Sequence, residues 1–414
     1  MAFRFVHTAD LHLDSPLRSL ALREAGLAEL IGNASRTVLS RIVDLCLSEA
    51  VQALVIAGDL YDGAQTSMKT ARFLAQEMER LAAAGIPVFV IRGNHDALSK
   101  ITRELVLPET VKVFTGRAEV VETEWNGHAV AVHGISFSNP QAPDSLLDRF
   151  RPPVAGAFNI GLLHTSLGGA PGHDPYAPCT LADLQRTGFD YWALGHIHQR
   201  AAYPGSPTVV MPGNPQGRDI GEAGAKSVTL VTVDDAGTVA LEARELAVAR
   251  FERLPVACGG LTDWSELVEA LKQALKAAPR NFAAEHLIVR PVLEGGSPLA
   301  WQARRDADLL LAEAQSLAER QGALWIDKLE VALDRGAEAR PGGAVGELAG
   351  LIDGSAPAAQ DPAVQAELDL LLKHLPKELR SLAGDTEAAV ADTLRAEMTR
   401  GALDLLARLD AAEG

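Results

Sequence analysis

Polar side chains of the kinds that bind metals recur directly after short β-type runs in the first half of the chain. The runs before them, such as Ala53–Ala57 and Val88–Ile91, predict buried strands. Because open α/β sheets place their sites at the carboxyl ends of strands, this order predicts a layered α/β domain with one site built from several loops. The segments are Asp10-Leu11-His12, Gly58-Asp59-Leu60-Tyr61-Asp62, Gly93-Asn94-His95-Asp96, His164 and Gly195-His196-Ile197-His198.

The spacing within these segments suits metal binding. Residues two apart on an extended chain point the same way, so Asp10 and His12 can grip one ion, as can His196 and His198. Each segment alone is weak, since a single buried histidine is more often a core residue than a ligand. The complete ordered set indicates a site with nitrogen and oxygen ligands and no thiolate.

Composition narrows the class of protein. With 414 residues, 47% hydrophobic and 22% charged, the chain predicts two or three globular domains. It has no apolar run of the ~20 residues that span a bilayer, and its first residues lack the pattern of a signal peptide. Three distant cysteines without a CxxC motif favour a reducing cytoplasm.

The net charge of −16 argues against a uniformly basic nucleic-acid binder. In an acidic chain with clustered carboxylates and imidazoles, we expect cations to bind first and an anionic substrate to bind through them.

Four parts are expected along the chain: a layered α/β domain over 1–250, a small α+β domain over 251–335, a Gly/Ala/Pro-rich linker over 336–361, and a helical tail over 362–414. In the first part, helices are expected near 34–50, 67–84 and 180–187, and the scarcity of later helices predicts that the later sheet is antiparallel. The expected strands are Arg4–His7, Ala53–Ala57, Val88–Ile91, Ala129–His133, Asn159–Leu163, Tyr191–Leu194, Thr208–Met211 and Ser227–Val233.

In the second part, helices are expected over Leu261–Ala278 and Leu299–Gln321, and strands over His286–Leu293 and Leu324–Leu333. The tail begins with Asp361-Pro362, a helix-start signal, and carries apolar stripes. These stripes either pack on their own domain or dock a partner's helices.

The ordered segments resemble the signature of calcineurin-like metallophosphoesterases over about residues 3–245. Within that superfamily, the chain is similar to bacterial DNA-repair exonucleases of the SbcD/YhaO type. The finer matches are His7-Thr8-Ala9-Asp10-Leu11-His12-Leu13-Asp14-Ser15-Pro16-Leu17, Ala193-Leu194-Gly195-His196-Ile197-His198-Gln199 and Pro212-Gly213-Asn214-Pro215-Gln216-Gly217-Arg218. The resemblance implies a metallophosphoesterase β-sandwich flanked by helices, then an α+β capping domain and a helical tail.

The resemblance also implies two divalent metal ions, preferably Mn²⁺, with Fe or Zn as alternatives. Asp59 would bridge both ions. The first would also be held by Asp10, His12 and His198, and the second by Asn94, His164 and His196.

By the same resemblance, a hydroxide bridging the metals attacks the phosphodiester, and His95 protonates the leaving group or steadies charge on the phosphate. Asp62 would orient His95; archaeal and eukaryotic repair nucleases have a histidine at that position. Asp96 braces the turn or caps a helix. Arg218 is a candidate for binding a substrate phosphate, with a salt-bridged arginine as the commoner alternative.

The function expected is a DNA exonuclease or phosphodiesterase acting in repair. The resemblance adds a coiled-coil ATPase of the SMC type as a possible partner of the tail, a possible homodimer, and no membrane. Hydrolysis of a non-DNA phosphoester (a monoester, a cyclic nucleotide or a lipid pyrophosphate) is the alternative, because the same two-metal core serves all of them. A scaffold with an inactive site is a third reading, weakened by the complete ligand set.

Overall fold

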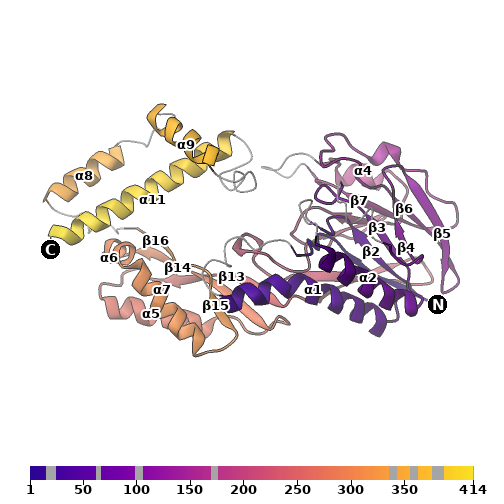
Figure 1. Ribbon diagram of the computed structural model, residues 1–414, viewed down its shortest axis with the longest axis horizontal. Coiled ribbons are helices and arrows are strands. Elements are labelled where there is room, and N and C mark those ends of the chain that lie inside the picture. The colour runs from indigo at the N-terminus through magenta and orange to yellow at the C-terminus, as the bar shows by residue number, and fades with distance from the viewer. Residues whose placement is uncertain are drawn as a thin grey trace. The chain divides into compact units, whose positions relative to one another are not determined.

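The computed structural model describes residues 1–14, 25–61, 67–97, 106–168, 176–334, 343–354, 362–374 and 387–413 (Figure 1). The chain forms two compact units. The first comprises Met1–Phe251 with Asn281–Leu287, and the second comprises Glu252–Arg280 with Ile288–Gly414.

The first unit contains two six-stranded sheets. In the first sheet β1 pairs in parallel with β2, β2 with β3 and β3 with β4, whereas β1–β11 and β11–β12 are antiparallel. Its spatial order is β12 (Val239–Glu245), β11 (Ser227–Val233), β1 (Phe3–Thr8), β2 (Ala53–Ala57), β3 (Val88–Ile91), β4 (Val111–Val113).

The second sheet is mixed, and the expectation that it is antiparallel is wrong for its centre. The pairs β6–β7, β7–β8 and β8–β10 are parallel, and the outer pairs β5–β6 and β10–β9 are antiparallel. The parallel crossovers run through loops and short helical turns, η1 (Leu147–Arg149) and α4 (Leu181–Gln185), so a scarcity of long helices did not reveal them. The spatial order is β5 (Glu119–Trp125), β6 (His128–Gly134), β7 (Phe158–His164), β8 (Tyr191–Gly195), β10 (Thr208–Met211), β9 (Ala201–Tyr203).

The two sheets pack face to face between helical layers, which confirms the expected α/β sandwich. On β2, Val55 points into the core between the sheets, while Leu54 and Ile56 belong to the core beneath α1 (Ala25–Ser48) and α2 (Met68–Ala83). This alternation follows from the two-residue period of a strand buried on both faces. A third core, containing Trp192, covers the other face of the second sheet.

Segment Asn281–Leu287 clusters with the first unit, although it lies inside the range predicted for the second domain. The backbone N–H groups of Glu285 and His286 donate to the Val248 carbonyl at 3.0 and 3.1 Å. The side chain of Glu285 pairs with Arg41 on α1. The sequence carries no pattern that signals this return of the chain, and the predicted domain bounds stay predictions.

The second unit contains a four-stranded sheet and the helices α5 (Trp264–Ala277), α6 (Ala300–Arg305) and α7 (Ala307–Glu319). The helix expected over Leu299–Gln321 is broken at Asp306, whose ψ of 25° departs from helical geometry. The strand expected over Leu324–Leu333 is two strands, Leu324–Ile326 and Glu330–Asp334, and the side chain of Asp327 between them accepts from Nε of Arg290 at 2.9 Å. The strands are β13 (Ala249–Ala257), β14 (His286–Gly296), β15 (Leu324–Ile326) and β16 (Glu330–Asp334).

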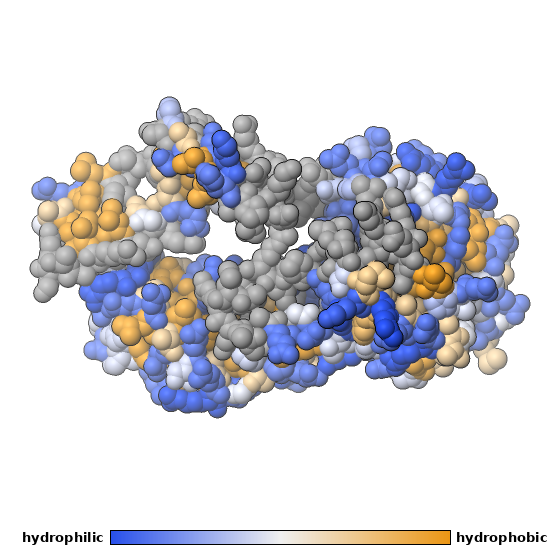
Figure 2. Space-filling view, viewed as in Figure 1, coloured by the Kyte–Doolittle hydropathy of each residue, from blue (hydrophilic) through white to orange (hydrophobic). Residues whose placement is uncertain are grey.

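Three further helices are α8 (Gly343–Gly354), α9 (Pro362–His374) and α11 (Glu387–Glu413). Helix α8 lies inside the predicted linker and contains Gly346 and Gly350, so its glycines were a misleading signal. Residues 335–342 and 355–361 lie outside the described residues. Trp301 of α6, Val345 of α8 and Leu406 of α11 form a buried cluster, so part of the tail packs on its own unit. Apolar residues also gather over α8 (Figure 2), and Leu351 of this helix is exposed.

None of the helices in the described ranges combines the length and apolar character that crossing a bilayer requires.

Two neighbouring leucines of α11 test its packing. Leu406 is 0% exposed and Leu405 is 51% exposed. We expect Leu406→Ala to destabilise the second unit by about 2–5 kcal/mol, because it leaves a cavity beside Trp301. Leu405→Ala should change stability by no more than about 0.5 kcal/mol. Urea unfolding and hydrogen exchange of the α8 and α11 amides measure both, and equal effects of the two variants would contradict this packing.

Candidate metal centre

The segments that follow β1 and β2 run side by side beyond the ends of their strands. The N–H of Asp10 donates to the Gly58 carbonyl, and that of His12 donates to the Asp59 carbonyl, each at 3.0 Å. Asp10, His12 and Asp59 adopt positive φ values of 54°, 42° and 52°. Such backbone is strained for residues other than glycine, and the hydrogen bonds between the two segments hold it in place.

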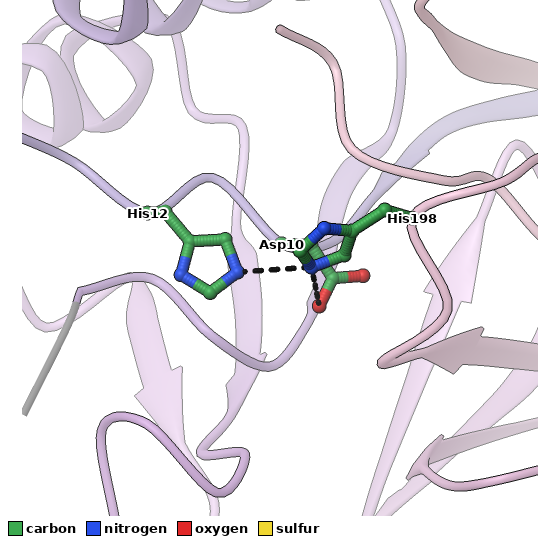
Figure 3. Close-up of side chains that lie close together, drawn as sticks. All are labelled: Asp10, His12 and His198. Atoms are coloured by element: carbon green, nitrogen blue, oxygen red, sulfur yellow. Dashed lines mark hydrogen bonds and ion pairs between the residues drawn. The ribbon is translucent and has the colours of Figure 1, made fainter. Parts of the chain in front are cut away.

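Asp10, His12 and His198 form the first group of converging side chains (Figure 3). The Nε2 atoms of His12 and His198 lie 3.1 Å apart, and Nε2 of His198 lies 3.9 Å from Oδ1 of Asp10. Asp10 and His12 are each 1% exposed. The Asp10 carboxylate also accepts the N–H of His196 at 3.0 Å, which ties the loop after β8 to the loop after β1.

Asp59, His164 and His196 form the second group. Nε2 of His164 lies 3.4 Å from Oδ2 of Asp59 and 2.9 Å from Oδ1 of Asn94. Oδ2 of Asp59 lies 3.9 Å from Nε2 of His12, so Asp59 stands between the two groups. The structure thus brings together the side chains of all the predicted metal ligands, and their role as ligands stays a prediction.

Two of the imidazoles are held with Nε2 facing the centre. Nδ1 of His164 lies 2.9 Å from the Ala57 carbonyl, which can only accept, so Nδ1 carries a hydrogen and Nε2 is the nitrogen that faces the centre. Nδ1 of His198 lies 2.6 Å from Oε1 of Glu222, which selects the same tautomer when Glu222 is ionised. Neutral imidazole with Nε2 directed inward is the form that binds a metal.

The electrostatics of the site favour cations. Burial acts to raise the pKa of Asp59, but the neighbouring imidazoles of His164, His12 and His95 outweigh it and hold the pKa well below its usual range. Burial acts to lower the pKa of His164, but the Asp59 carboxylate outweighs it and raises that pKa to about 9. Carboxylates that draw positive charge toward buried imidazoles also draw divalent cations.

The glycines before the ligands are required by close packing. A Cβ on Gly93 would lie 2.7 Å from Cε1 and Nε2 of His164, and a Cβ on Gly58 would lie 2.9 Å from Cγ of the same ring. Gly58 also has a φ of 97°. These contacts leave room for glycine alone beside the His164 imidazole.

Asp96 braces two ligand loops, which matches the first of the two roles expected for it. Its carboxylate accepts the N–H of Leu60 at 2.9 Å and the N–H of Gly93 at 2.6 Å. Burial, with the nearby Asp59 carboxylate, raises the pKa of Asp96 to about 7.

Glu222 was not singled out in the sequence. It binds His198, Arg218 and Asn214, and although burial acts to raise its pKa, the His198 hydrogen bond and the Arg218 charge hold that pKa well below its usual range. Its proximity to the Gly217-Arg218 stretch was the one available signal.

The remaining predicted residues are placed as follows. His95 is exposed, and its ring stands perpendicular to that of His12 with centroids 5.0 Å apart. Asp62 lies outside the described residues. The guanidinium of Arg218 pairs with Glu222 at 2.7 Å and lies 3.2 Å from Nδ1 of His198, so it stands behind that imidazole. Its contact with substrate stays a prediction.

Two separate parts of the chain each match a protein family. Residues 3–200 match the calcineurin-like phosphoesterases, and residues 251–334 match the middle domain of metallophosphoesterase YhaO. The chain is 33% identical over 297 residues to the uncharacterized metallophosphoesterase YhaO of Bacillus subtilis, a match that covers 71% of this chain and 72% of that protein. The chain belongs to the calcineurin-like metallophosphoesterases, in the YhaO branch.

More distant members of this superfamily are also similar. The chain is 26% identical over 220 residues to the DNA double-strand break repair protein Mre11 of Sulfurisphaera tokodaii, covering 51% of this chain and 54% of that protein. It is 26% identical over 224 residues to the Mre11 protein of Methanocaldococcus jannaschii, covering 50% and 57%. The chain thus spans about half the length of these two relatives. Together with the two family matches, these similarities confirm the resemblance to the superfamily and to the YhaO branch.

The donor set fits the two divalent ions of a metallophosphoesterase. Buried carboxylates, an amide oxygen and inward-facing Nε2 atoms lie within binding reach of two points, and two of the imidazoles are fixed from behind. The protein is a metal-dependent phosphoester hydrolase.

Two glycine variants test the packing against His164. We expect Gly93→Ala to weaken binding of divalent ions at least about 10-fold, because its methyl group displaces the Asp59 carboxylate and the His164 imidazole. Gly32→Ala, on α1 with no atom within 4 Å of the added methyl, should leave binding unchanged. Calorimetric titration with Mn²⁺ measures both, and full binding by Gly93→Ala would show that the His164 ring is not held as described.

Proposed function

We propose that the protein is a DNA phosphodiesterase, acting as an exonuclease in DNA repair with two Mn²⁺ ions. The observation that supports this most is that about half of the chain is similar to proteins named for double-strand break repair. All predicted ligands lie within residues 3–200, the part that matches the calcineurin-like phosphoesterases. The mixed nitrogen and oxygen donors suit Mn²⁺.

The seven ligand residues divide between the ions as the two side-chain groups suggest. Asp10, His12 and His198 hold the first ion, and Asn94, His164 and His196 hold the second, with Asp59 shared. When bound, the ions neutralise charge on the phosphate and lower the pKa of the attacking water.

His95 is the proposed catalytic residue. The backbone N–H of His95 donates to Oδ1 of Asp59 at 3.0 Å, which anchors the residue beside the ligands while its side chain stays exposed. From that place the imidazole can hold a proton and deliver it to the leaving oxygen. Asp62 orients the imidazole in this proposal.

The proposal extends to partners and compartment. The helical tail docks on a coiled-coil ATPase of the SMC type, the chain forms a homodimer, and it acts in the cytoplasm. Three buried free cysteines, Cys46, Cys179 and Cys258, suit a reducing compartment.

Hydrolysis of a smaller phosphoester is the second candidate, and the charge distribution favours it. Two arginines beside ligand segments are engaged by carboxylates: Arg36 by Asp14, two residues after His12, and Arg218 by Glu222. A chain with net charge −16 offers little of the basic surface that DNA normally requires.

Substrate choice separates the two candidates. With Mn²⁺ present, we expect hydrolysis of end-labelled DNA and of bis-p-nitrophenyl phosphate, both diesters, and little hydrolysis of p-nitrophenyl phosphate or cyclic nucleotides. Turnover of a monoester or a cyclic nucleotide with inert DNA would instead support the second candidate.

The role of His95 is tested separately. We expect His95→Ala to lower the turnover of the preferred phosphoester about 10²- to 10⁴-fold while Mn²⁺ binding is retained, because a proton donor is lost and no ligand is removed. His374→Ala, at an exposed histidine of α9, is the control and should leave turnover unchanged. Steady-state kinetics with calorimetry measure both effects, and normal turnover by His95→Ala would exclude the proposed role.

A further inference from the structure

We propose that Glu222 is the positioning residue of the metal centre: it fixes the His198 imidazole and thereby sets the affinity of the ion held with Asp10 and His12. The inference rests on the dimetal site alone and is independent of whether DNA is the substrate.

Both carboxylate oxygens of Glu222 are fully engaged. Oε1 lies 2.6 Å from Nδ1 of His198 and accepts from Nη2 of Arg218 at 2.7 Å. Oε2 accepts the backbone N–H of Arg218 and Nδ2 of Asn214, each at 2.8 Å. Nε of Arg218 adds a fifth contact, to Oε1 at 3.1 Å, so the carboxylate has one orientation and thereby orients the His198 imidazole.

His198 needs such support more than the other imidazoles do. It lies in the loop beyond β8, and its side chain is 23% exposed, whereas that of His164 is 0% exposed at the end of β7. The backbone of the loop is tied as well, because the buried Lys226 donates from Nζ to the His198 carbonyl at 3.1 Å and to Oδ1 of Asn214 at 2.8 Å. Asn214 therefore connects Glu222, which holds the His198 ring, to Lys226, which holds the His198 backbone.

The two groups of ligands are supported in chemically different ways. His164 rests on a neutral backbone carbonyl, while His198 rests on a carboxylate. A carboxylate acceptor raises the basicity of an imidazole ligand more than a carbonyl does, so it strengthens the bond to the metal. The ion beside Asp10 and His12 should therefore depend on a replaceable side chain, and the ion beside Asn94 should not.

Glu222→Gln removes the charge and keeps the shape. We expect it to weaken one of the two Mn²⁺ ions about 10- to 100-fold and to leave the other unchanged. Glu77→Gln is the matched control. Glu77 is buried like Glu222, with 10% against 13% of its side chain exposed. It likewise binds an arginine, Arg80, at 2.6 Å, but it lies on α2 away from the ligands. Calorimetry measures the affinity of each ion, and the electron paramagnetic resonance of Mn²⁺ measures how many ions are bound.

The outcomes are distinct. Selective weakening of one ion in Glu222→Gln, with both ions kept by Glu77→Gln, supports the inference. Unchanged binding in Glu222→Gln, or equal loss of both ions from a chain that unfolds as cooperatively as the control, overturns it.

If Glu222→Gln does not fold, the inference is tested on the unsubstituted chain. With diamagnetic Zn²⁺ bound, ¹⁵N spectra of the imidazoles should show His198 protonated on Nδ1 and unprotonated on Nε2, and the signal is assigned by its loss in His198→Asn. The opposite tautomer would overturn the inference. Neither measurement contains a substrate, so a failure of the proposed DNA activity would leave both results intact.

Discussion

The burial of two carboxylates, Asp10 and Asp59, is the constraint on which the centre depends. Each is 1% exposed, and an ionised carboxylate in such a place is unstable unless cations and hydrogen-bond donors surround it. Backbone N–H groups of His95 and His196 supply donors, and the imidazoles direct Nε2 toward the two acids. The positive φ values, the glycines and the Asp96 brace all serve to hold donors around these two acids.

Several strands of the two sheets were readable from the sequence because they are buried. Ala53–Ala57, Val88–Ile91, Thr208–Met211 and Ser227–Val233 were predicted with the bounds that the structure has. The strands β4, β5, β9, β12 and β13 were missed, since they are short or half-exposed and so lack a continuous apolar signal. The directions in which neighbouring strands pair were also not predicted, because the length of a loop does not show whether the strands it joins run parallel or antiparallel.

The residues of the metal centre were likewise predictable only in part. Spacing and resemblance pointed to the side chains that face the centre, because those chains follow strands whose carboxyl ends share one edge. The side chains behind the ligands could not be found so readily. Glu222 contacts His198 across 24 positions, and this contact depends on the tertiary path through Asn214 and the turn η2 (Ile220–Glu222).

This division suggests which parts of such a centre can vary. His164 ends a strand in the middle of the second sheet and is fixed by a backbone carbonyl, so the fold itself maintains it. His198 lies in a loop and is fixed by side chains, so single substitutions can retune it without disturbing the sheets. The two ions can therefore differ in affinity within one scaffold. A difference of this kind would let the fold retain one ion firmly while the second adjusts to the metal supply or to the substrate.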